Sequence, residues 1–394
     1  MNNHELKKGY KQTDVGIIPE DWEVRKLSEI AEIATGNTPP TNDLTNYGDE
    51  YLFVSPADIG KAKYVFDTEK KLSRKGFKLS RRFPKHSILF TCIGSTIGKS
   101  AVSLNELTSN QQINAVFPNL SYSTDFIFYN LNLLAPKIKA SASEQAVPII
   151  NKSSFGETLL PLPPLPEQQA ISEVLSDVDA LITSLDELIA KKRNIKQGTM
   201  SLLLTGKKRL QGFHGDWETK KLGEIFEISA GGDFIPKHSS EIKDEKHQYP
   251  IYSNSIANKG LYGYSSYFVY RENALTVTAR GTLGVTNFRN HKFTAIGRVL
   301  VLHPTKPLDC FFVSEFINNR IEFVIESTGV PQLTAPQIGA YEIPFPPLTE
   351  QKAIAEILSE MDSEIEALEA KRAKYQALKQ GMMQELLTGK TRLV

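Results

Sequence analysis

The sequence has little of what secreted, metal-binding or membrane proteins require. It contains two cysteines, Cys92 and Cys310, which are too few and too far apart for a disulfide framework or a cysteine-based metal site. No apolar run reaches the roughly 18 residues of a membrane-spanning helix. The segment 1–8 lacks the apolar core of a secretory signal, so we expect a cytoplasmic and reduced protein.

Motifs that would indicate an enzyme are incomplete. The segment 94–100, Gly-Ser-Thr-Ile-Gly-Lys-Ser, is similar to a phosphate-binding loop, but three residues separate its glycines where four are required. The segment 37–40, Asn-Thr-Pro-Pro, departs from the Asn-Pro-Pro-aromatic motif of amino-methyltransferases in spacing and in its last residue. The seven histidines show no metal-ligand spacing. We therefore predict no catalytic residues, no cofactor-binding residues and no metal site.

The sequence is dominated by an internal repeat. The segment 163–210 recurs at 346–393, and about 26 of its 48 positions are identical. Both copies open with Pro-Pro-Leu-x-Glu-Gln and close with Leu-Leu-Thr-Gly-Lys before a final Arg-Leu. A second repeat, at an offset of 195 residues, relates Trp22 and Leu27 to Trp217 and Leu222. These offsets predict two tandem copies of one unit of about 190 residues.

Between the repeated segments, short apolar runs alternate with turn residues. The runs 87–93, 114–117, 274–279 and 298–302 are typical of buried strands. Helical spacing appears at 26–33, 125–134, 222–228 and 310–324. The fold class is therefore α+β, with one globular domain at 1–162 and a second at 213–345.

The repeated segments themselves predict two long amphipathic helices, at 167–205 and 350–388, within the segments 163–212 and 346–394. Apolar residues follow the alternating spacing of a coiled-coil seam, with Pro166 in the first turn, Thr349 as an N-cap, and Gly206 and Gly389 after the ends. The seam residues are Ile171, Leu175, Val178, Ile182, Leu185 and Ile189 in the first helix, and Ile354, Leu358, Met361, Ile365, Leu368, Tyr375, Leu378 and Met382 in the second.

An apolar stripe of this length needs a partner. The simplest is the other copy in the same chain, which gives an antiparallel coiled coil with a pseudo-two-fold relationship between the repeats. Two alternatives are packing of each helix on its own domain and pairing between chains. Lys192 and Thr199 stand where the second helix has Tyr375 and Met382, so this part of the first helix is expected to meet a different neighbour.

The arrangement of a variable domain, a Pro-Pro-Leu-x-Glu-Gln helix start and a Leu-Leu-Thr-Gly-Lys helix end, all repeated, resembles the DNA specificity subunit of type I restriction-modification systems. The resemblance covers essentially the whole chain. It implies two target recognition domains, each recognising one half of a split and asymmetric DNA sequence, separated by two spacer helices. It also implies a non-catalytic subunit.

The resemblance further implies partners: double-stranded DNA, two copies of a methyltransferase subunit and, in some complexes, two restriction subunits, with no membrane. S-adenosylmethionine, ATP and Mg are then expected on the partner subunits. The methyltransferase contacts are expected at the two helix starts, which comprise Pro163, Pro164, Leu165, Glu167 and Gln168, and Pro346, Pro347, Leu348, Glu350 and Gln351.

The charge distribution agrees with DNA binding. The net charge is only +1, but segment 61–85 carries ten Lys or Arg against Asp67 and Glu69. Its predicted phosphate contacts are Lys61, Lys63, Lys70, Lys71, Arg74, Lys75, Lys78, Arg81, Arg82 and Lys85. In the second domain the predicted DNA contacts are Tyr264, Arg280, Arg289, Lys292 and Arg298. A solvated charged surface is the plainer interpretation of such a run.

Two other functions remain open at this stage. One is a coiled-coil scaffold that presents two protein-binding domains, which predicts no salt-sensitive, sequence-dependent DNA binding. The other, which the incomplete motifs argue against, is a DNA methyltransferase or an NTPase.

Overall fold

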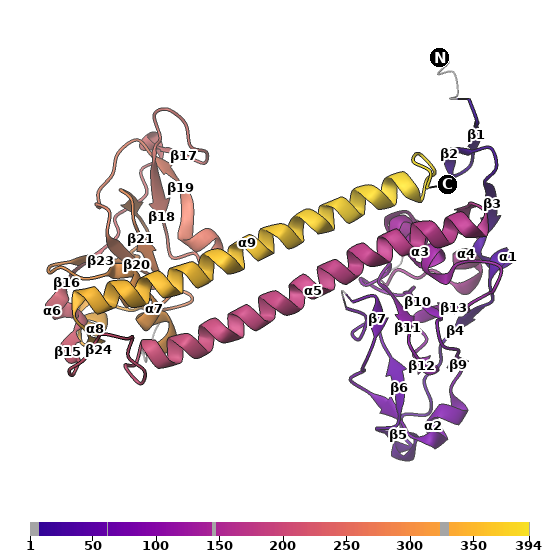
Figure 1. Cartoon of the computed structure of the whole chain (residues 1–394), viewed down its shortest axis with the longest axis horizontal. Coiled ribbons are helices and arrows are strands. Elements are labelled where there is room, and N and C mark those ends of the chain that lie inside the picture. The colour runs from indigo at the N-terminus through magenta and orange to yellow at the C-terminus, as the bar shows by residue number, and fades with distance from the viewer. Residues whose placement is uncertain (1–7, 61, 144–146, 324–330, 394) are drawn as a thin grey trace. The chain divides into compact units, whose positions relative to one another are not determined.

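The computed structural model describes residues 8–60, 62–143, 147–323 and 331–393. Its contacts divide the chain into two compact units. Unit 1 takes residues 1–188 and 369–394, and unit 2 takes residues 189–368. Each unit combines sheets with helices, which confirms the α+β class, and each contains part of both long helices (Figure 1). None of the helices formed by the described residues combines the length and the hydropathy that a membrane span requires.

Unit 1 contains two five-stranded sheets. The first has the order β4 (Ile33–Thr35), β13 (Ile113–Val116), β10 (Ile88–Thr91), β11 (Ser100–Ser103) and β7 (Tyr64–Val65). The second has the order β5 (Tyr47–Gly48), β8 (Lys71–Leu72), β6 (Tyr51–Val54), β12 (Leu107–Ser109) and β9 (Arg82–Phe83). A hairpin, β1 (Tyr10–Thr13) with β2 (Gly16–Pro19), and the short helices α2 (Arg74–Leu79) and α4 (Lys152–Gly156) complete its periphery.

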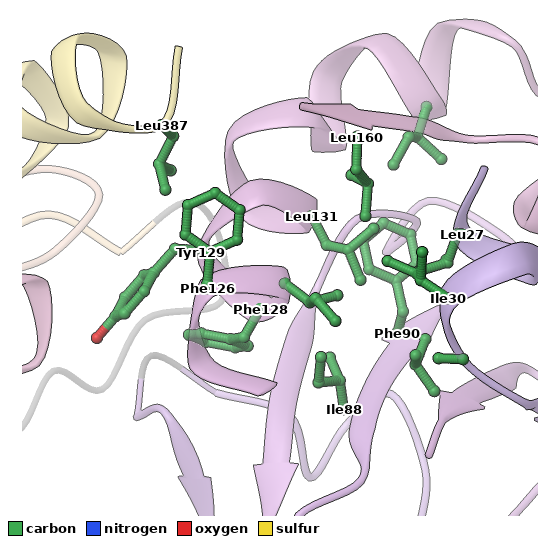
Figure 2. Packing of buried hydrophobic residues seen from close by; sticks show 14 of the residues in the cluster. Leu27, Ile30, Ile88, Phe90, Phe126, Phe128, Tyr129, Leu131, Leu160 and Leu387 are labelled. Atoms are coloured by element: carbon green, nitrogen blue, oxygen red, sulfur yellow. The ribbon is translucent and has the colours of Figure 1, made fainter. Parts of the chain in front are cut away.

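The core of unit 1 forms around α3 (Thr124–Ala140). Phe126 and Leu131 of this helix are fully buried in one cluster with Phe90 of the first sheet. Leu387, from the far end of the sequence, belongs to the same cluster, and Figure 2 shows it extending toward Phe126 and Tyr129. The last residues of the chain therefore help to fill the core of a domain that begins near its first residues.

Unit 2 contains two four-stranded sheets. The first has the order β16 (Phe226–Ala230), β23 (Leu300–Pro304), β20 (Ala274–Val277) and β21 (Thr286–Arg289). The second has the order β17 (Ser239–Ser240), β19 (Leu261–Ser265), β18 (Tyr249–Tyr252) and β22 (Thr294–Ala295). Helix α7 (Cys310–Arg320) packs against β21 and β20, and α8 (Ala335–Gly339) lies near β16. The helix predicted at 310–324 ends at Arg320, so its last part was wrong, and position 324 lies outside the described residues.

In each unit, the repeated segment that contains the tryptophan forms a strand, and this strand pairs with a strand that lies just before a long helix. In unit 1, β3 (Glu23–Lys26), just after Trp22, pairs antiparallel with β14 (Leu159–Leu162), just before the proline pair. In unit 2, β15 (Glu218–Lys221) pairs in the same way with β24 (Glu342–Phe345). The helices that follow, α1 (Leu27–Ile30) and α6 (Leu222–Ile225), are single turns, so the longer helices predicted at 26–33 and 222–228 were wrong. After each single turn the chain becomes extended again, because β4 pairs with β13 in the first sheet of unit 1 and β16 pairs with β23 in the first sheet of unit 2.

The two long helices are confirmed as α5 (Leu165–Leu203) and α9 (Leu348–Leu386), each of 39 residues (Figure 1). Each begins and ends two residues earlier than predicted, so Thr349 lies inside the first turn and is not an N-cap. Gly206 and Gly389 follow the ends with φ values of 68° and 71°, a conformation that favours glycine. Leu378 is 49% exposed, so its predicted place in the seam was wrong, and the neighbouring Lys379 faces α5 instead.

The two helices run antiparallel to each other within each unit. In unit 1, Asp179 pairs with Lys379 (2.6 Å) and Asp186 with Arg372 (2.6 Å). In unit 2, Lys192 pairs with Glu364 (2.6 Å) and Lys196 with Asp362 (2.7 Å). Lys192, expected to meet a different neighbour, therefore still faces the other helix, through an ion pair in place of an apolar contact.

Candidate nucleic-acid and partner interfaces

The basic segment of unit 1 forms one continuous stretch across β8, α2 and β9. Lys70, Arg74, Lys78, Arg81, Arg82 and Lys85 are all exposed there. Ser73 caps α2 by accepting a hydrogen bond from the Gly76 amide (3.3 Å). A shallow hollow of about 430 Å³ adjoins β8 and is lined in part by Tyr47, Lys70 and Lys71. Lys61 lies outside the described residues.

Some of the lysines and arginines in this segment pair with carboxylates, and others do not. Lys71 pairs with Asp67 (2.7 Å) and Lys75 with Asp43 (2.7 Å), and the contact from Lys75 lowers the pKa of Asp43 to about 2. Arg82 approaches Glu106 at 3.9 Å. Among the described residues no carboxylate pairs with five exposed members of the segment, which are Lys70, Arg74, Lys78, Arg81 and Lys85. Arg81 instead donates to the Thr35 carbonyl (2.6 Å), which leaves Lys70, Arg74, Lys78 and Lys85. These four are the most available for phosphate contacts.

Lys63 does not share this surface. Its side chain is 8% exposed, and its ammonium pairs with Asp125 (2.9 Å) and lies 5.0 Å from the ring centroid of Tyr129. It also donates to Ser176 of α5 (3.1 Å). Lys63 therefore connects the start of the basic segment to α3 and α5, and the structure does not present it to solvent.

In unit 2 the predicted DNA contacts separate into exposed and buried groups. Arg280 is exposed, and Gln332 Oε1 accepts hydrogen bonds from its guanidinium (2.9 and 3.1 Å). Arg298 is exposed in a left-handed turn with φ 67°. Lys292 is exposed above the ring of Phe268 (4.7 Å), and Tyr264 is half-buried in β19.

Arg289 is instead buried, with 4% of its surface exposed. Its guanidinium stacks 3.4 Å from the ring centroid of Tyr252 and donates to Thr276 Oγ1 (2.9 Å) and to the Lys259 carbonyl (2.5 Å). Burial lowers its pKa to about 10, since no carboxylate in the described chain pairs with it. The structure thus places Arg289 beneath the 253–260 loop and not at the surface.

The two helix starts are built around a buried carboxylate. Glu167, fully buried, accepts from Trp22 Nε1 (3.1 Å) and from the Arg392 guanidinium (2.6 and 2.8 Å). Unit 2 repeats the arrangement: Glu350, also fully buried, accepts from Trp217 Nε1 (3.0 Å) and from Arg209 (2.6 Å on each oxygen). Each helix start is therefore joined to the segment that follows the other helix.

The glutamine of the motif performs a second internal task. Gln168 Nε2 donates to the Pro163 carbonyl (2.8 Å), and its Oε1 accepts from the Ser123 amide at the start of α3 (2.9 Å). Gln351 repeats both contacts with Pro346 and with the Asp309 amide at the start of α7 (2.8 and 2.9 Å). These side chains are buried, so the motif orders its own unit.

Only part of each motif can meet another molecule directly. Pro163, Glu167 and Gln168 are buried, as are Pro346, Glu350 and Gln351. The exposed neighbours are Pro164, Pro166 and Gln169 in unit 1, and Pro347, Thr349 and Lys352 in unit 2, with Leu165 and Leu348 half-buried. Partner binding at these places stays a prediction, and it now concerns the exposed residues.

The tryptophan and arginine partners of these glutamates were not predicted from the sequence. A signal was present, because Trp22 and Trp217 occupy matching places in one repeat, and Arg209 and Arg392 in the other. What the sequence lacked was any indication that the two repeats meet, since they belong to segments separated by a whole variable domain.

The segment that resembled a phosphate-binding loop is a hairpin turn. In the connection between β10 and β11, the Gly98 amide donates to the Thr91 carbonyl (3.1 Å), and unit 2 has the corresponding bond from Gly284 to Thr278 (2.8 Å). Asn37 is likewise engaged locally, accepting from the Arg81 amide (2.5 Å) and donating to the Leu79 carbonyl (3.2 Å). Within the described ranges, no cluster of three His, Cys, Asp or Glu side chains could hold a metal ion.

Comparison with known proteins gives one consistent result. A family model described as the type I restriction modification DNA specificity domain matches residues 19–196 and again residues 214–377. The specificity subunit assigned to the type I restriction enzyme MjaX of Methanocaldococcus jannaschii is 31% identical over 425 residues, covering 98% of this chain and 97% of the relative. The MjaIX specificity subunit of the same organism is 26% identical over 380 residues, covering 86% of each chain.

Solved structures share the fold. The crystal structure of the S subunit of a type I restriction-modification system from M. genitalium superposes with a TM-score of 0.66 at 17% identity, covering 93% of this chain and 96% of that one. A chain from a study of complex assembly and conformational transition of the type I R-M system gives a TM-score of 0.56 at 17% identity, covering 95% and 99%.

Proposed function

Since the chain belongs to the family of type I restriction-modification DNA specificity subunits, we propose that it recognises a two-part, asymmetric DNA sequence and holds methyltransferase subunits on that sequence. Units 1 and 2 each recognise one half-site. Two linked recognition units multiply discrimination, because the second binds at a high effective concentration once the first is bound.

The observation that carries the proposal is the contrast between shared and unshared parts. Both units repeat the Trp–Glu–Arg cluster, the glutamine contacts and the antiparallel helix pair. The loops between the repeated segments differ in length and sequence, and segment 61–85 has no basic counterpart in unit 2. Equal surroundings suit two copies of one partner, whereas unequal loops suit two different half-sites.

The subunit is proposed to be non-catalytic. The partner subunits supply the chemistry, with S-adenosylmethionine bound by the methyltransferase, and ATP and Mg by a restriction subunit where one is present. The exposed residues beside Glu167 and Glu350 are the proposed methyltransferase contacts, one copy at each.

Mapping of methylated adenines tests this function. DNA from cells that express this chain with its methyltransferase partner should carry methylation at a split sequence whose two halves differ. Omission of this chain should remove that methylation. Methyl transfer by the purified chain alone, or salt-insensitive DNA binding with no sequence preference, would contradict the proposal and favour an enzyme or a scaffold respectively.

A further inference from the structure

At matching glycines in the two units, the backbone passes very close to the backbone of a neighbouring loop. This place is named the crossing. Gly36 and Gly231 are 195 residues apart and follow β4 and β16. The Gly36 amide donates to the Ile113 carbonyl (3.0 Å), and the Gly231 amide to the Val299 carbonyl (2.7 Å). A Cβ at Gly36 would collide with Ser109 and Asn110, and one at Gly231 would lie 2.8 Å from the Ala295 carbonyl carbon. The crossing therefore identifies corresponding loops in sequences that otherwise differ.

Three loops meet at this crossing in each unit. The loop before β13 is joined to the end of β6 by the Asn110 amide and Val54 carbonyl (3.0 Å), as the loop before β23 is joined to β18 by Ile296 and Tyr252 (2.9 Å). The loop after β10 is joined by the Cys92 amide to the Gln112 carbonyl (2.8 Å). The corresponding loops are 55–58, 92–99 and 110–112 in unit 1, and 253–260, 278–285 and 296–299 in unit 2.

In unit 2 a single asparagine holds the three loops together. Asn254 Oδ1 accepts from the Ala279 amide (2.7 Å), and its Nδ2 donates to the Gly297 carbonyl (2.6 Å). Each of these backbone partners is followed directly by an exposed arginine, Arg280 or Arg298. Asn254 thus ties together the backbones of the two loops that carry these exposed arginines.

The charge of this surface is of one sign. The three unit 2 loops contain no Asp or Glu. They carry Lys259, Arg280 and Arg298, and the buried Arg289 lies beneath the loop 253–260, where it donates to the Lys259 carbonyl. An unpaired buried cation under exposed cations produces a positive potential, which favours a polyanion such as DNA. Gln332 holds one edge of the Arg280 guanidinium, so less side-chain entropy is lost when the remaining N–H groups bind DNA.

The corresponding surface of unit 1 has amides in place of arginines. Its loops contain no arginine, and residues 110–112 are Asn-Gln-Gln. Gln111 is exposed and accepts from Thr38 Oγ1 (2.9 Å), while Asn110 Nδ2 donates to Gln112 Oε1 (3.0 Å). Asn37, next to Thr38, holds the Arg81 amide, so the basic segment lies next to this surface.

These two chemistries select different bases. Arginine donates a pair of hydrogen bonds to O6 and N7 of guanine, whereas asparagine and glutamine pair with N6 and N7 of adenine. We propose that the loops at this crossing recognise the bases, with Arg280 and Arg298 recognising guanine in one half-site. Gln111, whose Oε1 accepts from Thr38 Oγ1, recognises an adenine in the other. The inference rests on the proposed function and adds the bases that each unit recognises.

Methylation mapping with matched variants tests the assignment. The variants are Arg280→Gln, Arg298→Gln and Gln111→Ala, each expressed with the methyltransferase partner. The control is Arg271→Gln, an exposed arginine before β20, at the opposite end of that strand from Arg280. Each arginine variant should lower the preference for guanine at one position by about 5- to 150-fold. Gln111→Ala should weaken an A·T preference in the other half, and Arg271→Gln should change neither.

The unchanged half-site serves as an internal control for folding and assembly. The inference would be overturned if Gln111→Ala and the arginine variants lost base preference in the same half-site. It would also be overturned if the double variant Arg280→Gln/Arg298→Gln methylated the same sequence as the wild-type chain. If the proposed function itself is wrong, the experiment gives a different result, because the wild-type chain then directs no methylation at a split sequence.

Discussion

Lys196 Nζ lies 2.7 Å from both carboxylate oxygens of Asp362, and the same contact between α5 and α9 is made by Lys379 and Asp179, which occupy the equivalent positions of the repeat with the two helices exchanged. The third partners differ. Lys196 also meets Glu315 of α7 (3.2 Å), whereas at the second place the Tyr129 hydroxyl of α3 donates to Asp179 (2.8 Å). Each lysine therefore joins the helix pair to a helix of one recognition domain.

Replacement of the two lysines should have unequal effects. Lys196→Met removes the cation shared by Asp362 and Glu315 and should destabilise the protein by about 3 kcal/mol. Lys379→Met should cost clearly less, because Tyr129 still donates to Asp179. Urea unfolding measures both, with the exposed Lys191→Met as the control on the same helix. Equal losses for the two variants would show that the third partner has no influence.

The buried glutamates predict strong coupling to their arginines. Arg392→Met leaves Glu167 as a buried charge whose one remaining side-chain donor among the described residues is Trp22, and should cost about 3–5 kcal/mol. Glu167→Gln combined with Arg392→Met should cost less than the sum of the single changes, because no unpaired charge remains. A double-mutant cycle in urea measures the coupling, and the cycle of Glu350 with Arg209 provides the matched comparison. Additive effects would contradict the coupling.

The basic segment predicts a salt dependence that differs among its members. Replacement of Lys70, Arg74 and Lys78 by Ala should weaken binding to every DNA sequence and reduce the slope of log K against log salt by about 0.9 for each lost phosphate contact. Lys71→Ala and Lys75→Ala should change the slope less, since Asp67 and Asp43 already pair with these lysines. Titrations at several salt concentrations measure the slopes, and an unchanged slope in the triple variant excludes the segment from the interface.

His291 predicts a loss of stability at mildly acid pH. Burial, together with the charges of Arg289 and Lys243, lowers its pKa from the ordinary value, and Tyr252 Oη lies 2.8 Å from its Nε2. The unfolded chain then takes up a proton at a higher pH than the folded chain does. Stability should therefore fall as pH decreases through about 6.5, and the loss should be complete below the folded pKa. Unfolding of His291→Gln at pH 7.5 and 5.5 should show less of this loss, whereas exposed His214→Gln should retain it.

The architecture could be predicted where the sequence repeats itself. The duplicated segments predicted both long helices to within two residues at each end. Apolar residues that recur about every 3.5 positions over 39 residues are compatible with few structures other than a long amphipathic helix. Strands β10, β13 and β20 were also found, since their apolar runs are bounded by turn residues. Single turns such as α1 were overestimated, because helical spacing in a short segment does not show that the next residues will join a sheet.

The interfaces were harder to predict because charge alone does not determine exposure. Lys63 and Arg289 carry the same sequence signal as Arg74 and Arg298, yet the structure buries the first two against Tyr129 and Tyr252. Which cation faces solvent depends on packing between segments far apart in the chain. The proline-containing motif shows a related difficulty, because Glu167 was predicted to contact a partner subunit, and the structure shows it buried against Trp22 and Arg392, where it orders its own unit.

The division of the chain also determines the order in which its parts can be completed during synthesis. Residues 189–368, which contain all of unit 2, leave the ribosome before residues 369–394, which unit 1 requires. Leu386 and Leu387, which lie in the core of unit 1, and Arg392, which pairs with its buried Glu167, belong to this later segment. Unit 1 begins before unit 2 and is completed only after it, so a ribosome that stops just after residue 368 releases a chain with all of unit 2 and an incomplete unit 1.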